Sequence, residues 1–328
     1  MVQEILPGIY RIKVLLPRSP LEATNSYLIK SRERNLLVDT GWNREESRKA
    51  LFDGLAALDV VLEETDILLT HLHADHSGLT GAVATEKSKI YCSRIDSEIV
   101  NAMAGATYWP DIGVMFGAHG FPAEDLVQAM RSHPGRRYCT RKPQVFTTLS
   151  EGDVVEVGDY RFTCVETPGH TPGQVCLYEP KHKILFSGDH ILDDITPNIT
   201  FEKYIEDPLG HYLKSLDKID RLDISLVLTG HKRLIDDIHK RIGELKQHHQ
   251  DRLGEVLGIL RSGQMDAYQV AGQMTWDIDA ESWDLFPLAQ KVFAVGEAAT
   301  HLEHLQHTGR VKRIETNGKM FYELTKAL

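Results

Sequence analysis

The chain has 328 residues, of which 42% are hydrophobic and 26% are charged, which is typical of a globular protein with one large and one small domain. A formal net charge of −10 excludes general attraction to a polyanion and leaves only a local basic patch for nucleic acid. No apolar run reaches membrane-spanning length, and the first residues lack the pattern of a signal peptide. The four cysteines form no CxxC pair, so we expect reduced thiols and a cytoplasmic location.

Strands and helices alternate through the N-terminal part of the chain. Turn-rich breaks separate the strands that we expect at 9–16, 25–30 and 35–39. Next come a helix at 45–58, an apolar strand at 66–70, a helix at 77–85 and a short strand at 89–92. This alternation predicts an α/β fold.

Residues 94–148 differ in character from the segments on either side. Met and aromatic side chains are interleaved there with Gly and Pro, and the segment is too long for an ordinary connection and too apolar for a disordered linker. We interpret it as an insertion that caps a pocket, with Tyr108, Trp109 and His119 as pocket residues. The alternative is a helical insertion with a small core of its own.

The second half returns to alternating elements. Strands are expected at 154–157, 160–166, 174–178, 183–186 and 226–228, with helices at 209–222 and 235–260. Helices at 267–274 and 288–306 then precede two β-rich segments around Asn317-Gly318, a strong signal for a β-hairpin. Helices followed by a hairpin predict a winged helix, so we expect a catalytic domain at 1–250 and a winged-helix-like domain at 251–328.

Four potential metal ligands lie within the six residues from His71 to His76. They are His71, His73, Asp75 and His76, and they follow directly on the buried strand expected at 66–70. Imidazoles and a carboxylate bind first-row metals, and α/β sheets place their chemistry where strands end in loops. An exposed polar loop is the alternative, and the density of ligands argues against it.

Three further candidate ligands follow later strands in the same way. His170 lies in the turn Thr167–Gly173, Asp189 follows Ser187-Gly188, and His231 follows Thr229-Gly230. Each stands beside a glycine that permits a tight turn. The repetition of this arrangement, together with the dense first run, predicts a metal site built from several strand ends.

The motif His71-x-His73-x-Asp75-His76, with His170, Asp189 and His231, resembles the metallo-β-lactamase superfamily. Asp39-Thr40-Gly41 is similar to the acidic turn that precedes this motif in the family, and the C-terminal segment resembles the tail of the branch that includes the β-lactamase-like 2 proteins. The resemblance covers roughly residues 7–235 and implies an αββα sandwich with the site along one edge.

The resemblance also implies a role for each ligand in a dinuclear, glyoxalase II-like site. His71, His73 and His170 would bind one metal ion, Asp75, His76 and His231 would bind the second, and Asp189 would bridge them. The second site lacks the cysteine of the zinc β-lactamases, which lowers the expectation of lactamase activity. The ions are expected to be zinc, with iron or manganese as alternatives, because all seven ligands are N or O donors.

The ligand set predicts a metal-dependent hydrolase. Two adjacent divalent ions lower the pKa of a bridging water, and the resulting hydroxide attacks a carbonyl or phosphoryl centre while Asp75 and Asp189 take part in catalysis. The expected substrate is a small thioester or ester, and the alternative is a phosphodiesterase or endoribonuclease. Flavodiiron-type oxidoreductases use a similar fold, but this tail is too short for their flavodoxin-like domain.

Several other residues are candidates for supporting roles. Asp39 and His190 are expected to contact the ligands rather than to bind metal. Tyr204, His211 and Tyr212 are further candidates for a substrate pocket. The winged helix suggests a nucleic-acid-binding module by analogy of fold alone, with Arg310, Lys312 and Arg313 near the wing. We favour a small-molecule substrate and a tail that caps the site or forms a homodimer, with no membrane partner.

Overall fold

The computed structural model describes residues 2–278 and 280–325. A first sheet has seven strands whose spatial order is their chain order, antiparallel from β1 to β4 and parallel from β4 to β7. The strands are β1 (Val2–Leu6), β2 (Ile9–Leu15), β3 (Ala23–Ile29), β4 (Asn35–Val38), β5 (Thr65–Leu68), β6 (Ile90–Ser93) and β7 (Thr147–Leu149). Sequence analysis found β2 to β6 and missed β1 and β7.

A second sheet has five strands in the order β12-β11-β10-β9-β8, with one parallel pair between β11 and β12. The strands are β8 (Val154–Val157), β9 (Tyr160–Glu166), β10 (Val175–Glu179), β11 (Ile184–Gly188) and β12 (Leu226–Thr229). All of them lie where the sequence predicts strands. The sheets meet where β3 begins, because Thr24 and His231 form an isolated bridge between them.

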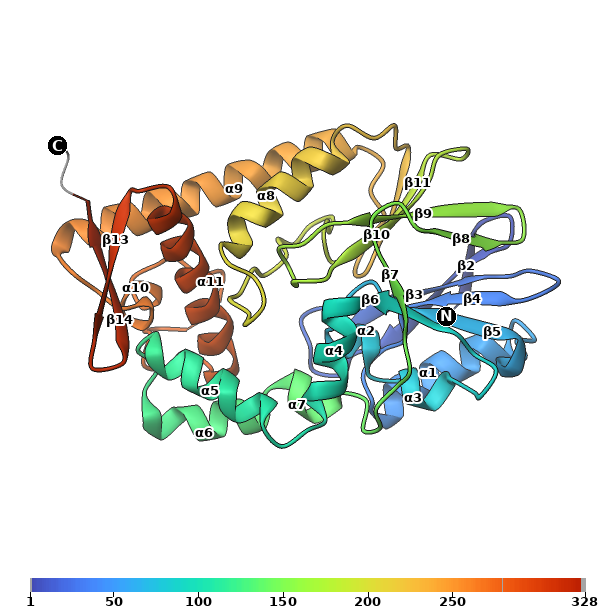
Figure 1. Cartoon of the computed structure of the whole chain (residues 1–328), viewed down its shortest axis with the longest axis horizontal. Coiled ribbons are helices and arrows are strands. Elements are labelled where there is room, and N and C mark those ends of the chain that lie inside the picture. Colours follow the sequence, from blue (N-terminus) through green and yellow to red (C-terminus); the bar gives the residue numbers. More distant parts are fainter. Residues whose placement is uncertain (1, 279, 326–328) are drawn as a thin grey trace.

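Alternate residues along the strands build separate cores, as the two-residue period of a strand requires. Leu36 and Val38 of β4 face the second sheet, where they join Phe162 and Phe186 in one cluster. Leu37, between them, packs with α1 in another cluster. The helices α1 (Glu45–Ala56), α2 (Ala74–Ser77) and α3 (Thr80–Val83) lie on the side of the first sheet, and α8 (Pro208–Ile219) and α9 (Ile238–Ile259) flank the second (Figure 1). The layers are therefore helix, sheet, sheet, helix.

The segment predicted as an insertion at 94–148 is a run of helices after β6, and its last two residues belong to β7. These helices are α4 (Arg94–Met103), α5 (Tyr108–Ala118), α6 (Ala123–Ser132) and α7 (Pro134–Tyr138). They extend from the two sheets toward the C-terminal elements (Figure 1). Apolar residues such as Phe116 and Met130 belong to the same buried cluster as Leu302 and Leu305 of the C-terminal helix. The insertion and the tail therefore share one core.

The C-terminal elements are two helices, a short 3-10 turn and a hairpin. They are the turn Leu260–Ser262, α10 (Ala267–Ala271), α11 (Leu288–His307), β13 (Val311–Thr316) and β14 (Lys319–Leu324). The hairpin closes at Asn317-Gly318, where both residues have a positive φ, as predicted. The predicted domain boundary at 250 falls inside α9, which continues to Ile259, and the division into two domains stays a prediction. Within the described ranges, no helix is long and apolar enough to span a membrane.

Candidate metal centre

The candidate ligands converge at one edge of the two sheets. The run from His71 to His76 follows β5, and His170 lies in the connection between β9 and β10. Asp189 follows β11, and His231 follows β12 by one glycine. The strands are buried and their ends face the same region, so segments far apart in the sequence bring their polar side chains together.

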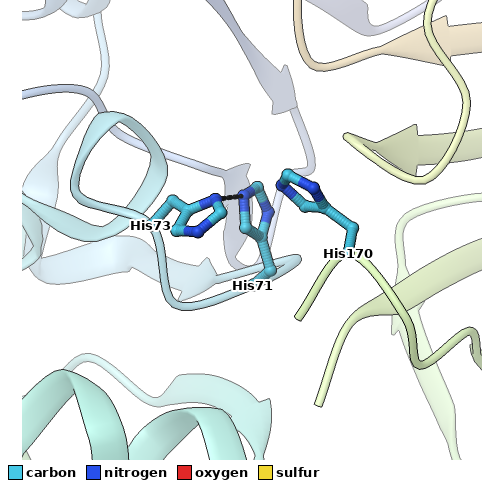
Figure 2. A group of neighbouring side chains, drawn as sticks. All are labelled: His71, His73 and His170. Atoms are coloured by element: carbon cyan, nitrogen blue, oxygen red, sulfur yellow. Dashed lines mark hydrogen bonds between the residues drawn. The ribbon is translucent and has the colours of Figure 1, made fainter. Parts of the chain in front are cut away.

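His71, His73 and His170 form the first group. A nitrogen from each ring lies within 4.8 Å of a nitrogen from the other two. His71 Nε2 and His73 Nδ1 are 3.1 Å apart. Figure 2 shows the rings of His71 and His73 on one loop and that of His170 on the facing segment, all pointing toward one another. We refer to these residues as the three-histidine group.

Asp75, His76 and His231 form the second group, again with ligand atoms within 4.8 Å of one another. The Nε2 atoms of His76 and His231 are 3.2 Å apart, and His231 Nε2 is 3.4 Å from Asp75 Oδ2. In place of the single helix predicted at 77–85, the structure has two short helices, α2 at Ala74–Ser77 and α3 at Thr80–Val83, and α2 carries Asp75 and His76. We refer to these residues as the aspartate-histidine group.

Asp189 lies between the groups. Its Oδ1 is 3.4 Å from His76 Nε2, and its Oδ2 is 3.3 Å from His231 Nε2 and 3.8 Å from His170 Nε2. Asp189 also joins His71 and His76 in a third set of ligand atoms within 4.8 Å. One carboxylate therefore reaches toward both groups.

Four of the imidazoles are held from behind through Nδ1, which leaves Nε2 facing the centre. Nδ1 of His71 is 3.0 Å from Thr70 Oγ1, that of His76 is 2.7 Å from Asp39 Oδ2, that of His170 is 2.8 Å from the Asn198 carbonyl oxygen, and that of His231 is 2.8 Å from the Ala23 carbonyl oxygen. Such contacts fix the ring orientation and the tautomer that presents a lone pair to a metal.

Asp39 supports ligands in both groups. Its Oδ2 accepts a hydrogen bond from the Thr70 hydroxyl at 2.8 Å, and Thr70 in turn contacts His71. The same oxygen contacts His76 directly, and Oδ1 accepts from the Thr70 amide at 2.8 Å. Asp39 is buried and its φ is +59°, which places the carboxylate in the tight turn after β4. Asp39 therefore contacts one candidate ligand directly and a second through Thr70, and its role in supporting metal binding stays a prediction.

Glycines make room for this arrangement at two strand ends. Gly188 has φ of +50°, and a Cβ there would lie 2.6 Å from Thr70 Oγ1. A Cβ on Gly230 would overlap the carboxylate of Asp189 and lie 2.8 Å from His76 Cε1. Both positions therefore require the absence of a side chain.

Burial leaves the three-histidine group neutral. Desolvation lowers the pKa of His73 to about 3 and that of His71 well below its usual value. It also lowers the pKa of His170. Neutral imidazole is the form that binds a metal ion, so these rings need lose no proton near neutral pH.

The aspartate-histidine group carries charge. Burial lowers the pKa of His76, but the carboxylates of Asp189 and Asp39 outweigh that effect and hold it well above the usual value. The same balance, again with Asp189 as the main partner, raises the pKa of His231 to about 9. Burial opposes ionisation of Asp75, yet its histidine neighbours, His231 foremost, lower its pKa to about 2.

The donor set fits two divalent cations. Nitrogen and carboxylate oxygen are suitable donors for zinc, iron or manganese. Among the described residues, His170 Nε2 and Asp189 Oδ1 are buried atoms without a hydrogen-bond partner, and both face the centre. An unpaired buried polar atom costs free energy unless something binds it. The buried His and Asp clusters are therefore consistent with a dinuclear metal site.

The predicted supporting residues near His170 are packed rather than exposed. The His190 ring is fully buried beside the ring of Tyr212, with centroids 5.3 Å apart, and burial lowers its pKa to about 3. Tyr212 is also fully buried, and its hydroxyl donates to the His190 carbonyl at 3.0 Å. A Cβ on Gly169 would lie 2.5 Å from Tyr212 Cα, so Tyr212 backs the turn that carries His170.

The other predicted pocket residues are spread over the insertion, the loop after β11 and the first turn of α8. Trp109 is buried, and its indole donates to the Met103 carbonyl. Tyr108 lies edge-on to Trp109, with ring centroids 5.1 Å apart. His119 is buried and stacked on Phe201, with ring centroids 4.6 Å apart. Tyr204 is 52% exposed and His211 is also exposed. The structure brings none of them into the ligand groups, and their contact with substrate stays a prediction.

Two residues that contact the loops of the centre were not predicted from the sequence. Asp96, on α4, is buried and accepts hydrogen bonds from the Leu72 amide, the Thr171 hydroxyl and the Gly173 amide. It thereby joins the loop of His71 to the turn of His170. Asn198 contributes its carbonyl to His170. Asp96 reads as an ordinary helix-start residue and a backbone carbonyl has no signature in a sequence, so neither gave a signal.

Comparison with known proteins identifies the family. A sequence profile of the metallo-beta-lactamase superfamily matches residues 20–231. The probable metallo-hydrolase YqjP of Bacillus subtilis is 26% identical over 298 residues, which are 85% of this chain and 86% of that protein. Human acyl-coenzyme A thioesterase MBLAC2 is 25% identical over 216 residues, 63% of this chain and 72% of that protein.

A solved structure is similar over the tail as well as the catalytic layers. The metallo-beta-lactamase family protein from Thermus thermophilus superimposes with a TM-score of 0.82 at 30% identity, covering 98% of this chain and 100% of that one. The resemblance stated from the ligand motif is thereby confirmed, and so is the prediction of a metal-dependent hydrolase. The chain belongs to the metallo-beta-lactamase superfamily.

Proposed function

We propose that this hydrolase acts on small thioesters, with acyl-coenzyme A thioesters as the first class to test, at a dinuclear metal centre. The observation that carries the proposal is the convergence of two buried ligand groups on Asp189, in a chain that resembles a relative named as an acyl-coenzyme A thioesterase. The three-histidine group would hold one ion, the aspartate-histidine group would hold the other, and Asp189 would contact both.

The chemistry divides between the ions and the side chains. Bound divalent ions supply Lewis acidity and lower the pKa of water, which is what hydrolysis of an acyl compound requires. Asp75 is the most exposed carboxylate of the centre, with 15% of its side chain accessible against 8% for Asp189. Asp75 is therefore the more accessible of the two carboxylates, and its oxygen would orient the attacking water. The buried position of Asp189 suits a ligand.

Zinc is the proposed metal, with iron and manganese as the alternatives. The seven proposed ligands are N and O donors that suit all three metals, so the choice is a matter for measurement. Metal analysis of protein purified with and without oxygen would decide it. Two zinc ions per chain in both preparations would support zinc. Iron that is present only in the protein purified without oxygen would make iron the metal of the centre.

The packing of the tail supports a small-molecule substrate over nucleic acid. We keep the winged helix as a proposal, because α10, α11 and the hairpin follow its element order. A recognition helix must present an open face to DNA. More than half of α11 is buried, including Val295, Ala299 and Leu302, and α11 packs against α8, α9 and α6. This supports a tail that is packed onto the catalytic domain over a surface that DNA would otherwise need.

The decisive assay compares substrate classes on one preparation. Acyl-coenzyme A thioesters of graded chain length, a β-lactam, a phosphodiester and single-stranded RNA would be incubated with the wild-type protein, Asp75→Ala and a Glu86→Ala control. Glu86 is an exposed acidic residue away from the ligands. We expect thioester turnover that chelation abolishes, that falls at least about 100-fold in Asp75→Ala and that is unchanged in the control.

Three results would overturn the proposal or its substrate class. RNA or phosphodiester cleavage that requires metal and Asp75, without thioester turnover, would make the protein a nuclease or phosphodiesterase. Thioester turnover that survives both chelation and Asp75→Ala would remove the metal centre from the reaction. β-Lactam turnover as fast as thioester turnover would replace the substrate class while keeping the centre.

A further inference from the structure

The segment that holds His170 has no regular structure of its own. Asn198, whose carbonyl oxygen lies 2.8 Å from His170 Nδ1, belongs to the connection between β11 and α8. An isolated bridge between Glu202 and Ile205 is its one paired feature among the described residues. The rings of His71, His76 and His231 are held instead by residues that lie in or beside the strands of the first sheet, namely Thr70, Asp39 and Ala23. A long irregular connection needs partners to hold it in one place.

The helix α11 provides such partners. The Thr300 hydroxyl lies 2.9 Å from the Ile199 carbonyl and equally far from the Glu297 carbonyl of its own helix. The Asn198 side-chain amide lies 3.4 Å from the Phe293 carbonyl. Gly296, between Phe293 and Thr300, faces Thr200, and a Cβ there would overlap the Thr200 hydroxyl. The three contacts are spaced by three and four residues, so one face of α11 lies against 198–200.

The packing around this contact is tight. Ile199 is fully buried, in the same apolar cluster as Val295 and Ala299 of α11. Arg241 of α9 holds the first part of the connection by donating to the Leu192 and Ile195 carbonyls at 2.7 and 2.9 Å. The part that carries Asn198 is therefore held by α11 and the part before it by α9.

We propose that α11 is a positioning element of the metal centre: it fixes 198–200, and the Asn198 carbonyl then fixes His170 with Nε2 toward Asp189. This inference rests on the proposed metal centre. It assigns the C-terminal tail a role in the three-histidine group and none in the aspartate-histidine group, whose rings are held by the first sheet. The tail thus acts on metal binding through one ligand.

Two variants of the full chain test the contact, and each has a matched partner. Gly296→Ala adds one methyl group against Thr200 and improves the helix propensity of α11. Gly258→Ala adds the same group to α9, where nothing lies within 4 Å. Thr300→Val removes the hydroxyl that reaches Ile199, and Thr300→Ser keeps it.

Cobalt(II) titration followed by visible absorption gives the affinity of each ion. His170→Ala and His231→Ala show which titration step belongs to which group. We expect Gly296→Ala and Thr300→Val to weaken the step lost in His170→Ala by about 10-fold and to leave the step lost in His231→Ala unchanged. In Gly258→Ala and Thr300→Ser, the cobalt affinity of both steps should stay within about 2-fold of the wild-type value. Such a change is smaller than the one expected when a ligand loses its hydrogen-bond partner.

A second measurement needs no metal and separates positioning from general damage. The ¹⁵N chemical shifts of the His170 ring in the metal-free protein report its tautomer, and thermal unfolding reports stability. We expect Gly296→Ala and Thr300→Val to lose the single Nδ1–H tautomer of the wild type while the control keeps it. Wild-type tautomer and wild-type affinities in both variants would overturn the proposal. So would equal weakening of both steps together with a lower Tm.

The proposal and the proposed function fail in different ways. If the wild-type chain does not bind two ions, the proposed dinuclear centre is refuted. The tautomer of His170 would still test whether α11 fixes the orientation of the ring. A wild-type chain that binds two ions and whose variants behave like the wild type would end the positioning role alone.

Discussion

The two groups of candidate metal ligands are built in different ways. The three-histidine group is neutral, because burial lowers the pKa of each of its rings. In the aspartate-histidine group, carboxylates hold the pKa of His76 well above its usual value and raise that of His231 to about 9. The first group therefore consists of neutral imidazoles, and the second pairs protonated histidines with carboxylates.

The supports of the two groups differ as well. His76 and His231 are held by Asp39 and by the Ala23 carbonyl, at the ends of strands in the first sheet. His170 is held by a carbonyl in an irregular connection that packs against α11. The first sheet supports rings of both groups, since Asp39 and Thr70 also contact His71, whereas only His170 is held by the connection that packs against α11. Asp189 is the residue that links the two groups.

Removing that link should have the largest effect. Asp189→Ala takes away the carboxylate that faces His170, His76 and His231, so neither group keeps its full donor set. We expect metal content to fall below two ions per chain and turnover to fall by more than about 100-fold, since loss of a mere hydrogen-bond partner of a ligand already costs roughly 10–100-fold. Elemental analysis and the thioester assay measure these two effects.

Asp193→Ala is the control for this variant. Asp193 lies in the same connection but pairs with Arg233 instead of the ligands. It should keep both ions and its activity. Full occupancy by two ions in Asp189→Ala would exclude Asp189 as a ligand shared by the two groups. It would also show that the two sites bind metal independently of this carboxylate.

The pH dependence of metal binding should separate the groups. His231, with a pKa raised to about 9, carries a proton at pH 6–8 that a metal ion must displace. Affinity at the aspartate-histidine group should therefore rise with pH by about 10-fold per unit for each proton released, until the pH passes that pKa. His73, with a pKa lowered to about 3, has no proton to lose in this range, so the three-histidine group should bind equally at pH 6 and pH 8.

Calorimetric titration at pH 6, 7 and 8, in buffers of different ionisation enthalpy, counts the protons released in each step. Release confined to one of the two steps would agree with the contrast between the groups. Equal proton release and an equal pH slope in both steps would mean that the groups have the same charge state, which contradicts the contrast drawn from their carboxylate neighbours.

Much of the centre was predictable because ligands at strand ends leave a local pattern. His71, His73, Asp75 and His76 stand together in the sequence, and Asp189 and His231 each follow an apolar strand and a glycine. The spacing of apolar residues in the sequence predicted the positions of most strands in both sheets. β1 was missed because its burial alternates poorly at the edge of the sheet, and β7 because it has only three residues.

The supports were less predictable because they depend on contacts between distant segments. Asp39 was identified from its turn, but its second contact, through Thr70 to His71, depends on the pairing of β4 with β5. The start of α2 at Ala74 was misjudged because ligand residues there read as a loop. The contact of α11 with Asn198 joins residues 95 positions apart and uses backbone atoms, which no residue pattern reveals.

The smallest predicted effect concerns how Asp39 serves both groups. Thr70→Val removes the hydroxyl between Asp39 and His71 but leaves the Asp39–His76 contact in place. We expect metal affinity of the three-histidine group to fall by up to about 10-fold, with the aspartate-histidine group unchanged. Asp39→Asn removes the charge that holds His76 and alters the contact with Thr70, so it should weaken both groups, and the aspartate-histidine group by more.

Thr65→Val is the matched control, because Thr65 is also buried and lies at the start of β5, the strand that precedes Thr70, with its hydroxyl donating to Val61 instead of toward the ligands. It should reproduce any general cost of burying a valine and leave both affinities at wild-type values. Equal weakening of both groups by Thr70→Val would show that Asp39 and Thr70 act as one unit, since His76 would then depend on the threonine hydroxyl too. Weakening of the three-histidine group alone would show that one carboxylate supports the two groups through separable hydrogen bonds.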